Sequence, residues 1–180
     1  MAEPGESHLV DTLCVLADRR VEFVVAGGVA MVLHGIERMT LDLDIAVSLE
    51  QANLHRFLAA IGQLGLVPRA PLPAETILDR DRIETVIHEK NALVFTFWNP
   101  SAPYKQVDMF LTRENSFDDL ISDAHALWIK GRRIWVASRR KLIEMKSRVR
   151  PIREKDETDI RELRRIDESS GKSGEPTVSE

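Results

Sequence analysis

Two aspartates one residue apart, Asp42 and Asp44, carry the clearest chemical signal in the sequence, within Leu41-Asp42-Leu43-Asp44-Ile45. Side chains alternate between the two faces of a strand, so both carboxylates are expected to point one way while the apolar residues around them point into a core. Neighbouring anions repel each other unless a cation lies between them, which indicates a divalent metal site. Oxygen-only ligands favour magnesium, or manganese, over zinc. The pair is therefore typical of a metal site for phosphoryl transfer.

A glycine pair and a third acid extend this pattern. Gly27-Gly28 follows an apolar segment, and a turn without Cβ atoms lets backbone N–H groups approach a phosphate, although such a pair is most often only a tight turn. Asp108 is a single carboxylate inside another apolar segment, where an unpartnered charge would be costly. Magnesium ions shared by the three acids would offset that cost. The alternative is ion pairing with arginines such as Arg38, which suits one acid better than three.

The elements that must hold these residues are predicted from hydrophobic periodicity. Apolar residues at helical spacing predict helices over about 7–19, 29–34 and 50–64. Alternating or continuous apolar runs predict strands over about 21–26, 41–48, 83–88, 92–98 and 104–111, and a hairpin of 127–129 with 134–136. The proline-rich segment 68–80 is expected to be a surface loop at the mouth of the site.

The C-terminal part is expected to be helical. Residues 116–122 indicate a helical turn, Ser138 can cap a helix carrying Lys146, Pro151 ends that helix, and a last helix is expected over 154–166. From Asp167 on, too few apolar groups remain to fold. We therefore expect an α/β (α+β) domain over 1–167, with a short mixed sheet flanked by helices and a C-terminal helical pair, followed by a disordered tail over 168–180.

Composition narrows the class of protein further. The chain has 180 residues, 43% hydrophobic and 30% charged, which is ordinary for one soluble domain. The N-terminus lacks an apolar leader and no run is long enough to span a bilayer, so a cytoplasmic protein without a membrane partner is expected. The single cysteine, Cys14, excludes an internal disulfide and is expected to be a buried thiol.

The net charge of −4 argues against indiscriminate nucleic-acid binding, but residues 130–155 are strongly basic. They indicate either a positive field that meets phosphates or a set of solvated helix and hairpin faces. The tryptophans and the histidines carry weaker signals. The tryptophans Trp98, Trp128 and Trp135 are expected in the core, although they could stack bases. His34 is expected to be a cap or a satisfied polar group, and the other histidines lack zinc-ligand spacing.

Taken together, these motifs resemble the DNA polymerase β-like nucleotidyltransferase superfamily. Its pattern is a Gly-Gly or Gly-Ser turn, an Asp-hydrophobic-Asp strand and a distant third aspartate. More narrowly, the chain is similar to small prokaryotic nucleotidyltransferases of the AbiEii-toxin-like and MNT-like kind. That likeness covers most of residues 20–166 and is carried by the segments 26–30, 38–45, 142–146 and 153–160.

The resemblance implies a role for each matching residue. Asp42, Asp44 and Asp108 would be the metal ligands and catalytic acids, with Asp108 nearest the acceptor hydroxyl. Gly27 and Gly28 would cradle phosphates, although many active members have serine at the second position. Two further residues, Lys146 and Asp159, occupy positions that serve activity in AbiEii-like members, and a salt bridge joining the last two helices is the alternative. Arg38 would contact phosphate or pair with Asp42 or Asp44.

The function implied is magnesium-dependent transfer of a nucleoside monophosphate from an NTP to an acceptor hydroxyl. The acceptor would be an RNA end such as that of tRNA, or a protein side chain, and the protein would belong to a toxin–antitoxin system with a cognate partner. The competing hypothesis is a catalytically degenerate protein of the same fold that binds nucleotide or a toxin–antitoxin partner. The sequence does not specify the NTP, the acceptor or the oligomeric state.

Overall fold

The fold is built on one mixed β-sheet, seen in a computed structural model that describes residues 4–90 and 92–172. Side chains are described from His8 on, except at 90 and 169–172. Seven strands lie in the order β3-β4-β5-β2-β1-β7-β6. Their bounds are β1 Phe23–Ala26, β2 Asp42–Val47, β3 Val67–Pro68, β4 Val94–Asn99, β5 Ala102–Phe110, β6 His125–Ile129 and β7 Arg132–Val136. The β2–β5 and β1–β7 pairs are parallel and the other pairs are antiparallel.

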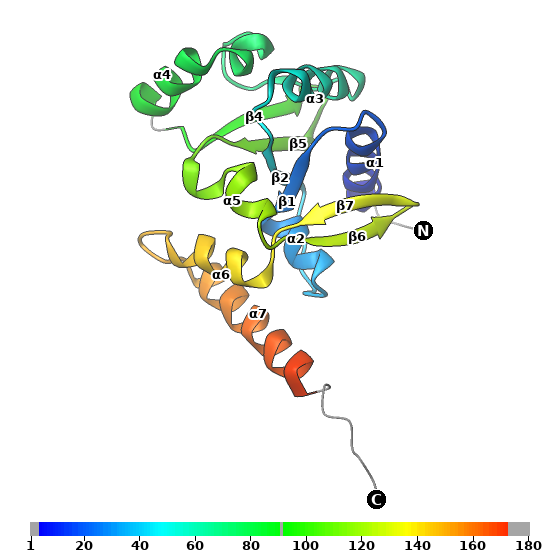
Figure 1. Ribbon diagram of the computed structural model, residues 1–180, viewed down its shortest axis with the longest axis vertical. Coiled ribbons are helices and arrows are strands. Elements are labelled where there is room, and N and C mark those ends of the chain that lie inside the picture. The colour runs from blue at the N-terminus through cyan, green and yellow to red at the C-terminus, as the bar shows by residue number, and fades with distance from the viewer. Residues whose placement is uncertain (1–3, 91, 173–180) are drawn as a thin grey trace, which may run out of the picture.

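Helices surround this sheet, and Figure 1 shows α6 and α7 at the end of the molecule opposite α3 and α4. The helix bounds are α1 Pro4–Asp18, α2 Gly27–Leu33, α3 Gln51–Gln63, α4 Arg80–Lys90, α5 Phe117–Ile121, α6 Arg139–Ser147 and α7 Glu154–Lys172. Two 3₁₀ turns, η1 Ala74–Leu78 and η2 Arg113–Asn115, complete the fold. No described helix is both long enough and apolar enough to cross a membrane.

One part of the core lies on the sheet face opposite the acids. Phe57 of α3 packs edge-on against Phe97 of β4, with ring centroids 5.6 Å apart. Leu43 and Ile45 of β2, which alternate with Asp42 and Asp44, are completely buried. This is the expected alternation of apolar and acidic side chains along one strand. The α/β fold with a mixed sheet flanked by helices is therefore confirmed.

Two expectations about the middle of the chain are wrong. Residues 83–88 belong to α4 rather than to a strand, because Asp79 accepts a hydrogen bond from the Arg82 N–H (3.1 Å) at the start of the helix. Ile83 and Ile87, four positions apart, then lie on one helical face. The segment 68–80 is not an irregular loop, since it contains the end of β3 and the turn η1, in which Ile77 is buried.

The C-terminal helical pair is present, with different bounds at its end. The Ser138 hydroxyl accepts a hydrogen bond from the Lys141 N–H (3.1 Å), which confirms the expected cap of α6. The last helix, α7, continues to Lys172, so the boundary expected at 167 falls inside it. The rest of the expected disordered tail, residues 173–180, lies outside the described residues.

Some single-residue expectations also changed. Trp128 is 72% exposed and does not belong to the core. Trp98 and Trp135 are half-buried, each covered by an arginine guanidinium at 4.8 and 5.2 Å from the ring. Cys14 is half-buried rather than buried. His34 is a satisfied polar group as expected, because its Nε2 lies 2.8 Å from the Ala137 carbonyl oxygen.

Candidate active site

The three acids predicted as metal ligands lie on one face of two neighbouring strands, β2 and β5. Asp44 of β2 is the register partner of Ala26 in β1 on one side and of Asp108 in β5 on the other. Asp42, two residues earlier, shares the face of Asp44 and pairs in register with Gln106. Partners in register present side chains to the same face, so the sheet brings together carboxylates that are far apart in the chain.

Asp108 is held by two side chains of its own sheet face. The Thr96 hydroxyl donates to Asp108 Oδ1 (2.6 Å), and the Gln106 amide donates to Oδ2 (2.9 Å). Gln106 in turn accepts a hydrogen bond from Arg69 (3.0 Å), whose guanidinium covers the ring of Trp98. Asp108 is only 9% exposed, so these bonds satisfy a buried carboxylate and fix its orientation.

Close packing against Asp44 and Thr40 requires glycine at both positions of the pair. Gly27 has φ +57°, and a Cβ added there would lie 1.9 Å from Asp44 Oδ2. A Cβ at Gly28 would lie 2.4 Å from the Thr40 hydroxyl oxygen. Gly28 also donates its backbone N–H to the Asp44 carboxylate. The pair begins α2, two residues earlier than predicted, and brings the Gly28 N–H next to Asp44, while the predicted approach to a phosphate stays a prediction.

Asp44 has the most perturbed electrostatics of the three acids. Burial, followed by the negative charges of Asp108 and Asp42, raises the pKa of Asp44 from 3.8 to about 6, against the lowering effects of the Gly28 N–H and Lys146. The acids thus repel one another in the absence of a cation, as expected for carboxylates that share a site. A perturbed carboxylate in a cleft is typical of a functional site.

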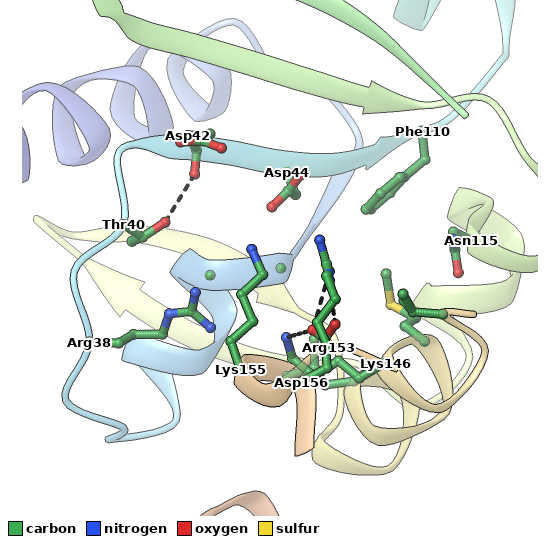
Figure 2. A pocket seen from close by; sticks show the side chains of 15 residues that line it. Arg38, Thr40, Asp42, Asp44, Phe110, Asn115, Lys146, Arg153, Lys155 and Asp156 are labelled. Atoms are coloured by element: carbon green, nitrogen blue, oxygen red, sulfur yellow. Dashed lines mark hydrogen bonds and ion pairs between the residues drawn. The ribbon is translucent and has the colours of Figure 1, made fainter. Parts of the chain in front are cut away.

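A cavity of about 340 Å³ opens beside the acids. One part of its wall contains the glycine pair with Arg38, Thr40, Asp42 and Asp44, and the opposite part comes from α6, α7 and the end of β5. Figure 2 shows Asp42 and Thr40 toward one end and Phe110 with Asn115 toward the other, with Asp44 between them. The volume lies within the range of small-ligand sites.

The predicted cationic residues belong to a network at the base of this cavity. Asp159 binds both Arg38 and Lys146, each at 2.6 Å, and is not among the residues that line the cavity. Asp156, 1% exposed, lies 3.3 Å from Lys146 and 2.6 Å from Arg153. Arg38 therefore pairs with Asp159 and with neither Asp42 nor Asp44, so that expected alternative is wrong. The salt bridge between Lys146 and Asp159 joins α6 to α7, and Lys146 also lines the cavity.

Nine lining residues were not predicted as site residues, namely Thr40, Leu142, Met145, Val149, Phe110, Asn115, Arg153, Lys155 and Asp156. The last three precede or begin α7, and Figure 2 shows Arg153 and Lys155 extending from there toward β2. Their adjacency to the expected Asp159 was the available signal. Phe110 lies two positions after Asp108, so strand alternation alone would have placed it on the face of the acids.

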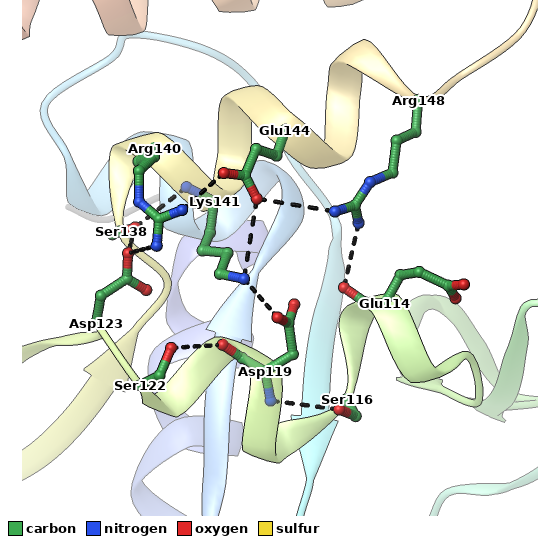
Figure 3. Close-up of polar contacts among 10 residues, drawn as sticks. All are labelled: Glu114, Ser116, Asp119, Ser122, Asp123, Ser138, Arg140, Lys141, Glu144 and Arg148. Carbon is green, nitrogen blue, oxygen red and sulfur yellow. Dashed lines mark hydrogen bonds and ion pairs between the residues drawn. The ribbon is translucent and has the colours of Figure 1, made fainter.

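The basic segment 130–155 is largely neutralised by acids from other parts of the chain. Arg132 pairs with Asp18 at 2.7 Å, and Arg140 pairs with Asp123 at 2.6 Å. Figure 3 shows how Asp123, Glu144 and Asp119 together surround Arg140, Lys141 and Arg148. Most of this segment therefore forms solvated ion pairs that hold α6 in place, and the reading as a continuous positive field loses its support.

The donor set partly fits a divalent cation. The acids supply only oxygen atoms, which hard cations such as magnesium prefer as ligands. They also lie on one face, and the charges of Asp108 and Asp42 destabilise the ionised Asp44 when no cation is present. Within residues 4–90 and 92–172, however, no three His, Cys, Asp or Glu side chains are gathered closely enough to hold one ion. Two carboxylates, Asp42 and Asp44, together with water and substrate phosphates, match the usual magnesium arrangement better than a complete protein cage.

Fold and site together define a class: this is the nucleotidyltransferase fold, with acids on adjacent central strands beside a glycine-initiated helix. The chain is similar in structure to the lincosamide antibiotic adenylyltransferase LnuA with bound lincomycin, with a TM-score of 0.58 and 17% identity over 89% of this chain and 97% of that one.

Two further solved structures share the fold. The antibiotic-resistance factor ANT(2'')-Ia matches with a TM-score of 0.54 and 14% identity, over 93% of this chain and 90% of its own. An antigenic nucleotidyltransferase-like protein from Paracoccidioides brasiliensis matches with a TM-score of 0.54 and 16% identity, over 92% and 78% respectively. No protein-family model matches the chain, and no curated protein sequence matches it. The likeness therefore establishes the fold, while the narrower AbiEii-like and MNT-like kinship stays a prediction.

Proposed function

We propose that the protein is a nucleotidyltransferase that moves a nucleoside monophosphate from an NTP to an acceptor hydroxyl and releases pyrophosphate. The observation that carries the proposal is that Asp42, Asp44 and Asp108 share one sheet face, where Asp42 and Asp44 line a cavity of about 340 Å³ together with Gly27 and Gly28. The fold shared with a lincosamide antibiotic adenylyltransferase, an antibiotic-resistance factor and a nucleotidyltransferase-like protein supports the same class of reaction.

In this reaction the acceptor oxygen attacks the α-phosphorus, and the bond from that phosphorus to the oxygen bridging the β-phosphate breaks. The hydroxyl proton passes to Asp108, and the departing pyrophosphate carries the negative charge away. Asp108 suits this role because Thr96 and Gln106 hold its carboxylate in one orientation on the face of the acids. Positioning of the hydroxyl and the phosphorus supplies much of the acceleration.

The phosphate groups lie at the glycine end of the cavity. Gly27 and Gly28 line this end without side chains, and the Gly28 N–H donates to the Asp44 carboxylate, so the glycine pair holds that acid beside the phosphates. Lys146 and Lys155 line the same cavity, and Lys155 forms no ion pair with any residue of the described ranges, so its charge remains for the ligand. Charge placed where phosphate charge develops lowers the barrier.

Asp42 and Asp44 are the residues that would hold magnesium, or manganese, with Asp108 nearby. When bound, such an ion supplies charge neutralisation for the carboxylates and for the phosphates of the nucleotide. The roles of Lys146, Asp159 and Arg38 follow from their network. Asp159 holds both cations at the base of the cavity, so we assign it the positioning of Lys146 and Arg38 rather than contact with substrate.

Three classes of acceptor fit this reaction: an RNA end, a protein side chain and a small hydroxylated molecule. The extensive ion pairing of residues 130–155 removes the main argument for RNA. LnuA, a lincosamide adenylyltransferase with lincomycin bound, shares the fold over almost its whole length. We therefore place a small hydroxylated molecule first, with an RNA or protein acceptor, as in a toxin–antitoxin pair, behind it.

The test is transfer of radiolabel from each α-labelled NTP, with magnesium, to three pools: total RNA, denatured protein and a panel of hydroxylated small molecules. We expect labelling of one pool with matching release of pyrophosphate. Asp42→Asn and Asp44→Asn should lower the rate by at least about a hundredfold, whereas Asp81→Asn, an exposed aspartate on α4, should leave it unchanged.

Nucleotide binding without transfer would instead support the catalytically degenerate alternative. In that case Asp42→Asn would alter the affinity for NTP while no pool is labelled by the wild type. Absence of both NTP binding and transfer, in protein shown to be folded by its thermal transition, would refute both hypotheses.

A further inference from the structure

The cavity beside the acids has two chemically different ends. Toward Thr40 the wall presents a hydroxyl, the glycine pair Gly27-Gly28 and the Lys155 cation, which suits phosphates. The other end carries Phe110 and the amide of Asn115 (Figure 2), and three further apolar side chains line the cavity, namely Leu142, Met145 and Val149. A triphosphate alone would fill only the first end.

Asn115 is the unusual group at the apolar end. Its side-chain oxygen is buried and has no hydrogen-bond partner among the described residues. A buried carbonyl oxygen without a donor is costly, so most such atoms in native proteins are partnered. A ligand that enters the cavity and offers an N–H group would satisfy it.

The backbone around Asn115 is fixed, so its amide is presented rather than free to turn away. The Asn115 N–H donates to the Thr112 carbonyl (3.3 Å), which closes the turn η2. Arg148, the residue directly after α6, donates to the Glu114 carbonyl (3.2 Å), which ties that turn to the end of the helix (Figure 3). Ser116 then caps α5 immediately after it.

Phe110 supplies a flat apolar face at the same end. It is the last residue of β5, lies two positions after Asp108, and is only partly covered by the protein. Figure 2 shows its ring near Asn115 and beyond Asp44 as seen from Thr40. An aromatic face beside an amide is the combination that binds a nucleobase, through stacking and through hydrogen bonds to its edge.

We propose that Phe110 and Asn115 form the nucleobase subsite of the cavity, with Phe110 stacking on the base and Asn115 reading its edge. The inference rests on the proposed function, because it assigns the base of the same NTP. The Asn115 oxygen accepts an N–H of the base, and its amide N–H₂ donates to a neighbouring ring or carbonyl acceptor. Asn115 is thus the residue that sets preference among the four NTPs.

The experiment measures how tightly the full chain binds each of the four NTPs in the presence of magnesium. Each affinity is compared with that for inorganic tripolyphosphate, which has the phosphates but no base. The wild type should bind one NTP at least about tenfold more tightly than tripolyphosphate, since stacking and an amide contact are each worth roughly that much. Phe110→Leu should lose most of this advantage, whereas Phe110→Tyr should retain it.

Asn115→Leu should reduce the differences among the four NTPs to about twofold or less. Tripolyphosphate affinity serves as the control for folding, because all three variants should bind it as the wild type does. If Asn115→Leu loses tripolyphosphate binding, Asn115→Ser takes its place, because it removes the same amide with a smaller change. The affinities of Asn115→Ser for the four NTPs are then compared in the same way.

Two outcomes overturn the inference in different ways. If tripolyphosphate binds as tightly as every NTP, or if Phe110→Leu and Asn115→Leu leave NTP affinity unchanged, the base subsite is refuted while nucleotidyl transfer stands. If the wild type binds neither probe, the proposed function fails, and the subsite fails with it.

Discussion

Replacing Asp44 by asparagine should stabilise the protein when no divalent cation is present. Asp44 is partly buried beside Asp42 and Asp108, and these surroundings raise the pKa of its carboxyl from 3.8 to about 6. Each pKa unit between the folded and unfolded states is worth about 1.4 kcal/mol. The ionised carboxylate therefore costs the folded state about 3 kcal/mol at neutral pH, and asparagine removes that cost while its oxygen still accepts the Gly28 N–H.

The pH dependence gives this prediction its sign. A group whose folded-state pKa is raised adds stability that is complete below its unfolded pKa, here about 4, and lost as pH rises through about 6. The wild type should therefore equal Asp44→Asn in unfolding free energy near pH 4 and fall below it by about 3 kcal/mol at pH 7.5. Comparing the two proteins at each pH cancels the titration of all other groups that both share.

Urea unfolding in EDTA, followed by circular dichroism, measures the difference. With a dependence of about 2 kcal/mol per molar urea, the midpoint of Asp44→Asn at pH 7.5 should lie about 1.5 M above that of the wild type. Asp81→Asn, at an exposed position, is the matched control and should show no shift. A variant less stable than the wild type at pH 7.5, or a difference that does not vary between pH 4 and 7.5, would refute the electrostatic reasoning.

Magnesium at about a thousand times its Kd should reverse this order. A ligand that binds only the folded wild type at that concentration adds about 4.1 kcal/mol, which exceeds the deficit of about 3 kcal/mol caused by the repulsion among the acids. Asp44→Asn, lacking one ligand carboxylate, should gain little. An equal gain for both proteins would show that the cation binds elsewhere.

Three further predictions concern stability and use the same unfolding assay. Gly27→Ala should lower the unfolding free energy by at least about 2 kcal/mol, because φ is +57° and the new Cβ would overlap the Asp44 carboxylate. Gly62→Ala, with open space around it in α3, should raise the unfolding free energy by up to about 1 kcal/mol. Equal effects of the two substitutions would contradict the packing argument. Asp156→Asn should cost about 3 kcal/mol at pH 7, since two cations lose a buried partner. Although burial alone would raise the pKa of Asp156, the surrounding cations hold it below its usual range, so this loss should shrink as pH falls below about 4. Ser138→Ala should cost about 1 kcal/mol through the lost α6 cap, and Ser138→Thr should retain most of it.

The part of the site that could be predicted from sequence is the part set by local geometry. Alternation along one strand placed Asp42 and Asp44 on a common face, and the glycine pair next to them follows from the preceding strand. Both inferences depend on neighbours in the chain. That Asp108 lies opposite Asp44 required β2 and β5 to pair in parallel and in this register, which the sequence does not specify.

The rest depends on tertiary packing, which the sequence does not display. Arg38, in the loop between α2 and β2, meets Asp159 of α7 only in the folded chain, so no local pattern could distinguish that partner from Asp42. Ile83 and Ile87 were assigned to a strand because a short apolar run fits either period. Trp128 is exposed because β6 is the outermost strand of the sheet, a position that its composition does not reveal.

The pairing of β2 with β5 has a consequence for how the protein can evolve. One face of this strand pair carries mutually repelling acids, and the other carries Leu43 beside Val107 and Ile45 beside Met109, none of them more than 2% exposed. Alternate residues of the same two strands thus supply the acids of the site and the apolar side chains of the core. A chain that lost its chemistry would be free to replace the acids and become more robust, whereas one that kept it must preserve these four apolar side chains almost as strictly as the acids themselves.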